Sequence, residues 1–176
     1  MKIIGLYFGT TSSTISFFNN EGVLASFEPF NGINYIPTVV SYYEGDIEIG
    51  NSAKKNRTVE HEVYENFKLL LGKNFNVVIK NKSKTPSEVT ANFIEELLKK
   101  YIKKQKIDGI DSIVMTVPEV WFYENSNRTA RENIQSIYKR LKSHKGFEKS
   151  QLKLTLRSEP EAAAAYFCRS YKLNKD

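Results

Sequence analysis

The sequence predicts an α/β fold: a mixed five-stranded sheet with helices on its faces, together with a small second subdomain. The chain opens with apolar runs at 3–8 and 14–19, and a short turn joins them as in a β-hairpin. A nearly continuous apolar strand follows at 113–117 and a further strand at 152–156, with helical patterns before, between and after them. A strand meander followed by alternating helices and strands is typical of a sheet that mixes antiparallel and parallel pairs.

The N-terminal meander is predicted to continue beyond the first hairpin. A strand at 23–27 follows an Asn-Glu-Gly turn, and strands at 39–43 and 47–49 flank a Glu-Gly-Asp turn. Pro37 precedes these two strands and predicts an interruption of regular pairing, because proline has no amide hydrogen to donate.

Weaker signals precede the first long helix. Residues 53–56 predict a short polar helix, and 59–71 predict a partly helical segment that ends at Gly72. The side chains expected to share one helical face in that segment are Val63, Phe67, Leu70 and Leu71. Residues 76–84 are rich in Lys and Asn, which predicts a loop with at most a short strand.

The second half alternates between helices and strands. A helix is predicted to start at Thr85, because Thr-Pro-Ser-Glu combines an N-cap, a first-turn proline and a capping-box glutamate, and to end near Lys104. The strand at 113–117 is apolar almost throughout, which predicts burial on both of its faces. A second helix is expected over 126–143, and a third from 159 onward.

Length and composition restrict the class of protein. The 176 residues fit one domain, and hydrophobic and aromatic fractions of 40% and 12% suffice for a core. No apolar run approaches the ~18 residues that span a bilayer, and no signal-peptide pattern is present, so no membrane partner is expected. The single cysteine, Cys168, is expected to be a small core residue of the last helix, and it fits a reducing, cytoplasmic compartment. The net charge of +6 favours acidic partners, but the lysine clusters lack the interleaved aromatics of a nucleic-acid surface.

The loop of the first hairpin is the first candidate binding site. Its glycine lets a ligand approach the backbone closely, and four hydroxyl side chains with consecutive amides could bind an anion. The residues concerned are Gly9, Thr10, Thr11, Ser12 and Ser13. An ordinary polar hairpin turn is the structural alternative, so the loop alone does not decide between the two.

Five segments, in order along the chain, resemble motifs of the DnaK-type heat shock protein 70 kDa chaperones. Residues 5–13 (Gly-Leu-Tyr-Phe-Gly-Thr-Thr-Ser-Ser) resemble the first phosphate loop, and residues 35–40 (Tyr-Ile-Pro-Thr-Val-Val) resemble the next signature. Residues 67–75 resemble the segment that carries the catalytic lysine, and 114–118 match the Thr-Val-Pro strand. Residues 158–164 (Ser-Glu-Pro-Glu-Ala-Ala-Ala) resemble the Glu-Pro-Thr-Ala-Ala-Ala element. Together they cover nearly the whole chain.

The resemblance implies the first lobe of an actin-like, ribonuclease H-like ATPase domain over 1–176. Residues 1–36 and 108–176 would form the main subdomain, and 37–107 a smaller one. ATP would lie in a cleft between this lobe and a second one, whose own phosphate loop would lie outside this chain. The chain is therefore expected to be a fragment of a longer protein.

The family's functional residues carry over position by position. The residues that would bind phosphate are Gly9, Thr10, Thr11 and Ser12. The ammonium of Lys68 would lie by the γ-phosphate and the attacking water, although without the resemblance a solvated lysine is the simpler interpretation. Glu159 would bind Mg²⁺ through water, since Mg²⁺ prefers oxygen ligands. Its structural alternative is a carboxylate that starts a helix before Pro160.

Two departures from the family pattern matter. The family has Asp in the first strand where this chain has Tyr7, and a phenol carries no charge at neutral pH. Metal-assisted hydrolysis should therefore be weak or lost, which leaves the protein's status as an enzyme open. The short stretch between 75 and 85 indicates a trimmed smaller subdomain.

The loop and the Ser-Glu-Pro element look most similar to the atypical branch of the family found in the ribosome-associated complex. That resemblance implies a J-domain co-chaperone, contact with the ribosome, and nascent or unfolded polypeptides as clients. Two alternatives stay open: an active ATP-hydrolysing chaperone and a sugar or acetate kinase of the same superfold. The kinase is disfavoured because the segments at 35–40 and 114–118 resemble the chaperones specifically.

Overall fold

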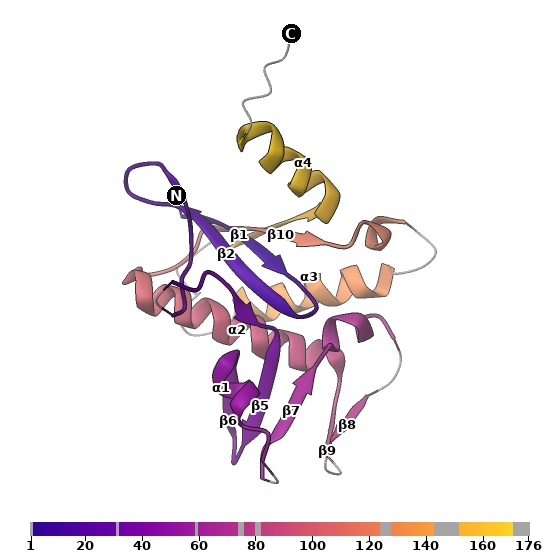
Figure 1. Ribbon diagram of the computed structural model, residues 1–176. Helices are drawn as coiled ribbons and strands as arrows, with labels where there is room; N and C mark the ends of the chain where they lie inside the picture. The colour runs from indigo at the N-terminus through magenta and orange to yellow at the C-terminus, as the bar shows by residue number, and fades with distance from the viewer. Residues whose placement is uncertain are drawn as a thin grey trace.

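Two β-sheets on either side of a long helix make up most of the molecule (Figure 1). The computed structural model describes residues 2–30, 32–58, 60–73, 76–79, 82–123, 128–142 and 152–170. Within this part of the chain, no helix has the length and apolar character needed to cross a membrane.

The larger sheet contains the N-terminal hairpin and the two later apolar strands. Its order is β11-β10-β1-β2-β3, with β4 pairing on β2. The strands are β1 (Ile3–Phe8), β2 (Ser12–Phe18), β3 (Leu24–Ser26), β4 (Ile36–Pro37), β10 (Ser112–Val117) and β11 (Lys153–Ser158). β1 is antiparallel to β2 and parallel to β10, which is parallel to β11, so the predicted mixed sheet is confirmed. The structure adds β4 to the five predicted strands. This strand is only two residues long, because Pro37 has no amide hydrogen with which to continue the pairing.

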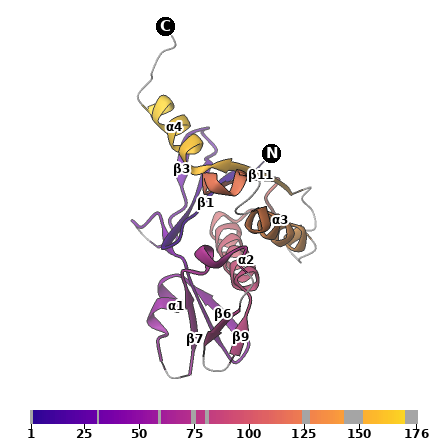
Figure 2. The same ribbon diagram turned by 90° about the vertical axis from the view of Figure 1, so that its right-hand side faces the viewer.

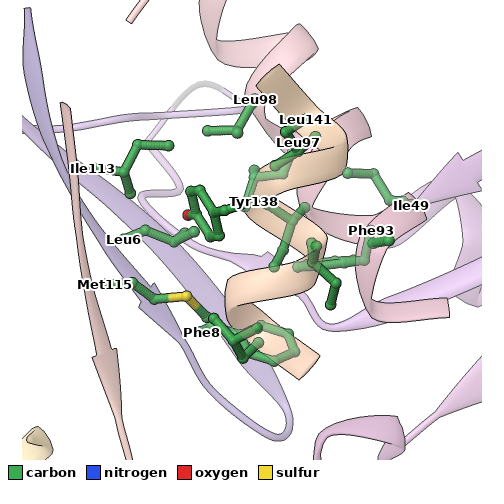
Figure 3. Packing of buried hydrophobic residues seen from close by; sticks show 14 of the residues in the cluster. Leu6, Phe8, Ile49, Phe93, Leu97, Leu98, Ile113, Met115, Tyr138 and Leu141 are labelled. Carbon is green, nitrogen blue, oxygen red and sulfur yellow. The ribbon is translucent and has the colours of Figure 1, made fainter. Parts of the chain in front are cut away.

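Two helices cover one face of this sheet, and a third lies on the other (Figures 1 and 2). Helices α2 (Pro86–Gln105) and α3 (Arg128–Lys142) pack against the buried side chains of β1 and β10. Figure 3 shows Leu6, Ile113 and Met115 facing Leu97 and Tyr138 across this core. The prediction that β10 is buried on both faces is wrong. Its residues alternate between buried and half-buried, because α4 (Glu159–Ser170) leaves the opposite face largely open.

The predicted long helices are confirmed. The Thr85 side chain caps α2 by accepting a hydrogen bond from the Glu88 amide at 3.0 Å. The same helix ends at Lys106, whose left-handed backbone conformation stops it close to the predicted position. The predicted ends of the 126–143 helix lie outside the described residues, and α3 accounts for the part between them.

The smaller sheet has the order β6-β5-β7, and a separate two-stranded hairpin lies beside it. Its strands are β5 (Val39–Tyr43), β6 (Asp46–Ile49) and β7 (Glu62–Glu65), followed by the hairpin of β8 (Val77–Ile79) and β9 (Lys82–Lys84). Helix α1 (Asn51–Lys55) and the 3₁₀ turns η1 (Phe67–Leu70) and η2 (Glu119–Phe122) complete the elements.

Three predictions in this region and in α4 need correction. The predicted helical segment at 59–71 contains a strand followed by a 3₁₀ turn. Tyr64 is buried and Val63 is only half-buried, whereas the expected helical face included Val63 and not Tyr64. Residues 76–84 contain a paired hairpin rather than a loop. Cys168 is exposed, not a core residue, because most of α4 stands clear of the sheet.

Candidate functional site

The loop between β1 and β2 is a tight turn held by its own backbone. The Gly9 amide donates to the Ser12 carbonyl oxygen at 3.1 Å. A Cβ atom on residue 9 would lie 2.3 Å from that oxygen and 2.7 Å from the Tyr7 ring, so only glycine fits there. The Gly9 amide, one of the predicted phosphate donors, is thus used in the turn. In the described part of the chain, the Thr10 and Thr11 amides have no such backbone partner.

The segment after β4 supports the loop from outside. The Thr38 amide donates to the Thr11 carbonyl oxygen, and the Thr38 hydroxyl lies 2.9 Å from that of Ser13. Both hydroxyls are buried, so the hydrogen bond between them replaces the bonds that each would make with water. Sequence reasoning assigned no role to Thr38, although it lies in the second resembling segment.

Lys68 lies at the end of β1, next to the loop. Lys68 belongs to η1, and its side chain is only 5% exposed. This burial excludes the interpretation of Lys68 as a solvated surface lysine. Its ammonium donates to the Phe8 carbonyl oxygen at 2.5 Å and to Glu159 Oε1 at 2.8 Å. The same nitrogen lies 5.6 Å from the centre of the Phe8 ring, a distance at which cation–π attraction contributes.

Glu159 reaches this site from the far end of the chain. It is the first residue of α4 and follows β11 directly, so it both starts a helix and pairs with Lys68. Its side chain remains 35% exposed. The structure therefore brings together three parts of the sequence: the loop after β1, Lys68 of η1 and Glu159 of α4.

Tyr7 and Thr116 lie side by side on the open face of the sheet, near the same loop. Their Cα atoms are register partners in β1 and β10, and Thr116 pairs in turn with Arg157 of β11. Tyr7 is 44% exposed. The Thr116 hydroxyl is buried and has no hydrogen-bond partner among the described residues. Thr116 lies in the fourth resembling segment, but sequence reasoning assigned it no role, because only strand register brings it beside Tyr7.

The described residues do not by themselves form a magnesium site. They contain no group of three or more His, Cys, Asp or Glu side chains that could hold a metal ion. Mg²⁺ is usually held by one or two carboxylates together with phosphate oxygens and water. Here the Glu159 carboxylate faces Lys68, and the nearby strand position holds Tyr7, whose side chain is a phenol and not a carboxylate.

Comparisons with known proteins identify the family to which the sequence is similar. A family model described as "Hsp70 protein" matches residues 3–89, which include the loop and Lys68. The chaperone protein DnaK of Mycoplasmopsis agalactiae is 34% identical over 128 residues, or 73% of this chain and 21% of that protein. The DnaK of Mycoplasmopsis synoviae is 30% identical over 165 residues, or 94% of this chain and 25% of that protein.

The chain belongs to the Hsp70 protein family.

Membership of the Hsp70 family confirms the predicted actin-like class of α/β fold, and the mixed sheet agrees with it. The chain spans about a fifth to a quarter of the length of these DnaK chaperones. The features described above are therefore those of one portion of an Hsp70-type protein.

Proposed function

We propose that this chain is the first lobe of an ATP-binding Hsp70-type chaperone or co-chaperone, in which the loop formed by residues 9–12 binds the phosphates through Thr10 and Thr11. The observation that carries the proposal is the position of the Lys68 ammonium, 2.5 Å from the carbonyl oxygen that precedes the loop. A buried cation beside a loop of free amides and hydroxyls suits a polyphosphate. The subdomain boundaries at 36 and 108 are part of the same proposal.

Each residue of the site has a distinct proposed role. The Thr10 and Thr11 amides and hydroxyls donate hydrogen bonds to phosphate oxygens, while Gly9 and Ser12 hold the loop in shape. The Lys68 ammonium stabilises negative charge that develops on the γ-phosphate. Glu159 fixes that ammonium, and it would hold Mg²⁺ through water when the metal accompanies bound ATP. Bound Mg²⁺ would neutralise phosphate charge.

Hydrolysis is proposed to be slow or lost because Tyr7 occupies the strand position beside the loop. A phenol is neutral at physiological pH and cannot help a carboxylate hold the water shell of a cation. The specific observation that favours the alternative, an active ATPase, is that Lys68 and Glu159 are both present and in contact.

The wider role follows the family resemblance. We propose that the protein works in the cytoplasm with a J-domain co-chaperone on nascent or unfolded polypeptides, near the ribosome. The net charge of +6 is compatible with a ribosomal location. The name of the relatives, chaperone protein DnaK, supports the chaperone part of this proposal and does not address the ribosome.

Titration of the full chain with ATP, followed by amide NMR, tests phosphate binding. We expect weak binding with shifts of the Thr10 and Thr11 amide signals, because half of the nucleotide pocket would belong to a second lobe. Thr10→Val with Thr11→Val should weaken the binding, whereas Thr129→Val, an exposed threonine on α3, should not. Unchanged loop signals at saturating ATP would refute the proposed site, and tight binding measured by calorimetry would refute the half-pocket argument.

A further inference from the structure

A cleft of about 850 Å³ lies between α3 and β11, at the edge of the larger sheet. Its apolar lining comes from Phe122, Leu154 and Leu156, and the two leucines are half-buried on the α3 side of β11. This cleft takes no part in the proposed phosphate site.

One wall of the cleft is a row of four long side chains, three of them cationic. Arg131, Gln135, Lys139 and Lys142 recur at the spacing of one helical face, and all four line the cleft. No ion pair involving Arg131, Lys139 or Lys142 is present among the residues that the structure describes. Glu132 is the one carboxylate in the lining, so the wall carries a net positive charge.

The other wall is the outer edge of a β-sheet. In the described part of the chain, β11 pairs with β10 alone, and its other side forms the sheet edge. An edge strand offers backbone donors and acceptors in the spacing of another strand, and this edge lies beside the cationic row. An extended peptide could thus pair with β11 while alternate side chains point toward α3.

We propose that this cleft binds an extended acidic peptide, which adds a strand to β11 and places alternate Asp or Glu side chains against Arg131, Lys139 and Lys142. The charge of the wall selects acidic side chains, and the strand edge selects a polypeptide backbone. A nucleic acid fits less well, because Phe122 is the only exposed aromatic ring in the lining, too few for successive bases to stack.

Fluorescence anisotropy of the full chain at low salt tests the proposal with labelled octapeptides. The probe alternates Glu and Thr. One control alternates Lys and Thr, and another is the Glu-Thr peptide with every backbone amide N-methylated, which keeps the charge but removes the backbone donors. We expect the Glu-Thr peptide to bind about tenfold more tightly than either control, and amide exchange in β11 to slow when it binds.

Charge reversal locates the binding surface. The triple variant R131E/K139E/K142E should bind the Glu-Thr peptide at least about tenfold more weakly. A control with the same change of net charge, K54E/K100E/K103E on α1 and α2, should bind it normally because these lysines lie outside the cleft. If the triple variant fails to fold, R131Q/K139Q/K142Q replaces it.

Three results would overturn the proposal. Equal loss of binding in the two charge variants would show that only net charge matters. Equal binding of the Glu-Thr peptide and its N-methylated form would exclude strand pairing with β11. Tighter binding of an oligothymidine than of the Glu-Thr peptide would assign the cleft to nucleic acid.

Discussion

Replacing Lys68 with methionine should destabilise the fold by about 2 kcal/mol. The methionine keeps an apolar stalk in the same space but removes the charged donor that the Phe8 carbonyl oxygen accepts. A hydrogen bond from a charged group contributes about 1.5–3 kcal/mol when its acceptor is buried. The ion pair to Glu159 adds only about 0.5–1 kcal/mol, because that carboxylate is 35% exposed and water screens it. The variant also avoids the free-energy cost of burying an ammonium group, which offsets part of the destabilisation from the two lost interactions.

Urea unfolding of the full chain, followed by circular dichroism, measures this effect. Lys73→Met is the matched control, because Lys73 lies five residues later and is exposed. Glu159→Gln should cost less than Lys68→Met, and the double variant should give a coupling energy below about 1 kcal/mol. A cost for Lys68→Met no larger than that of Lys73→Met would refute the reasoning. So would a coupling energy that accounts for the whole effect, since the Phe8 carbonyl would then contribute nothing.

Three further substitutions test the loop and the core. Gly9→Ala should cost about 1–3 kcal/mol of unfolding free energy, because its Cβ meets the Ser12 carbonyl. Gly5→Ala should cost less in the same urea titration, because its Cβ meets the rotatable hydroxyl of Ser16. Tyr138→Phe should stabilise the protein by about 1 kcal/mol, because the buried Tyr138 hydroxyl has no partner in the described residues and points toward Leu6 and Ile113 (Figure 3). Burial also raises the pKa of Tyr138 above its usual value, so above pH ~10 the unfolded chain loses this proton while the folded chain keeps it. Stability should therefore fall as pH rises through that range, and Tyr138→Phe should reduce the slope by about 1.4 kcal/mol per pH unit in alkaline urea titrations.

Local signals in the sequence predicted most of the elements. Thr85 and Glu88 start α2 as expected, since capping depends on neighbours three residues apart. The apolar run of β10 identified a strand but not its half-open face, because the openness depends on how little of the sheet α4 covers. β7 was missed because its burial alternates over four residues, too few to distinguish from a helical face.

The site also depends on contacts between residues far apart in the sequence, which local signals do not predict. Lys68 and Glu159 were identified by resemblance, and each also had a simpler structural interpretation. Their contact joins positions 91 residues apart, and the contact of Lys68 with Phe8 joins positions 60 apart. No local sequence pattern encodes such pairs. No local pattern encodes the cleft beside β11 either, because it forms only where α3 and β11 come together in the fold.

We propose that the loop holds a phosphate while the strand beside it is poorly suited to help cleave one. Single-turnover ATP hydrolysis by the proposed two-lobe protein tests this, with the natural sequence and with Tyr7→Asp. We expect slow or undetectable hydrolysis in the natural protein and a large gain in the variant, with ATP binding retained in both. Turnover by the natural protein at the rate of active family members, unchanged by Tyr7→Asp, would contradict the account.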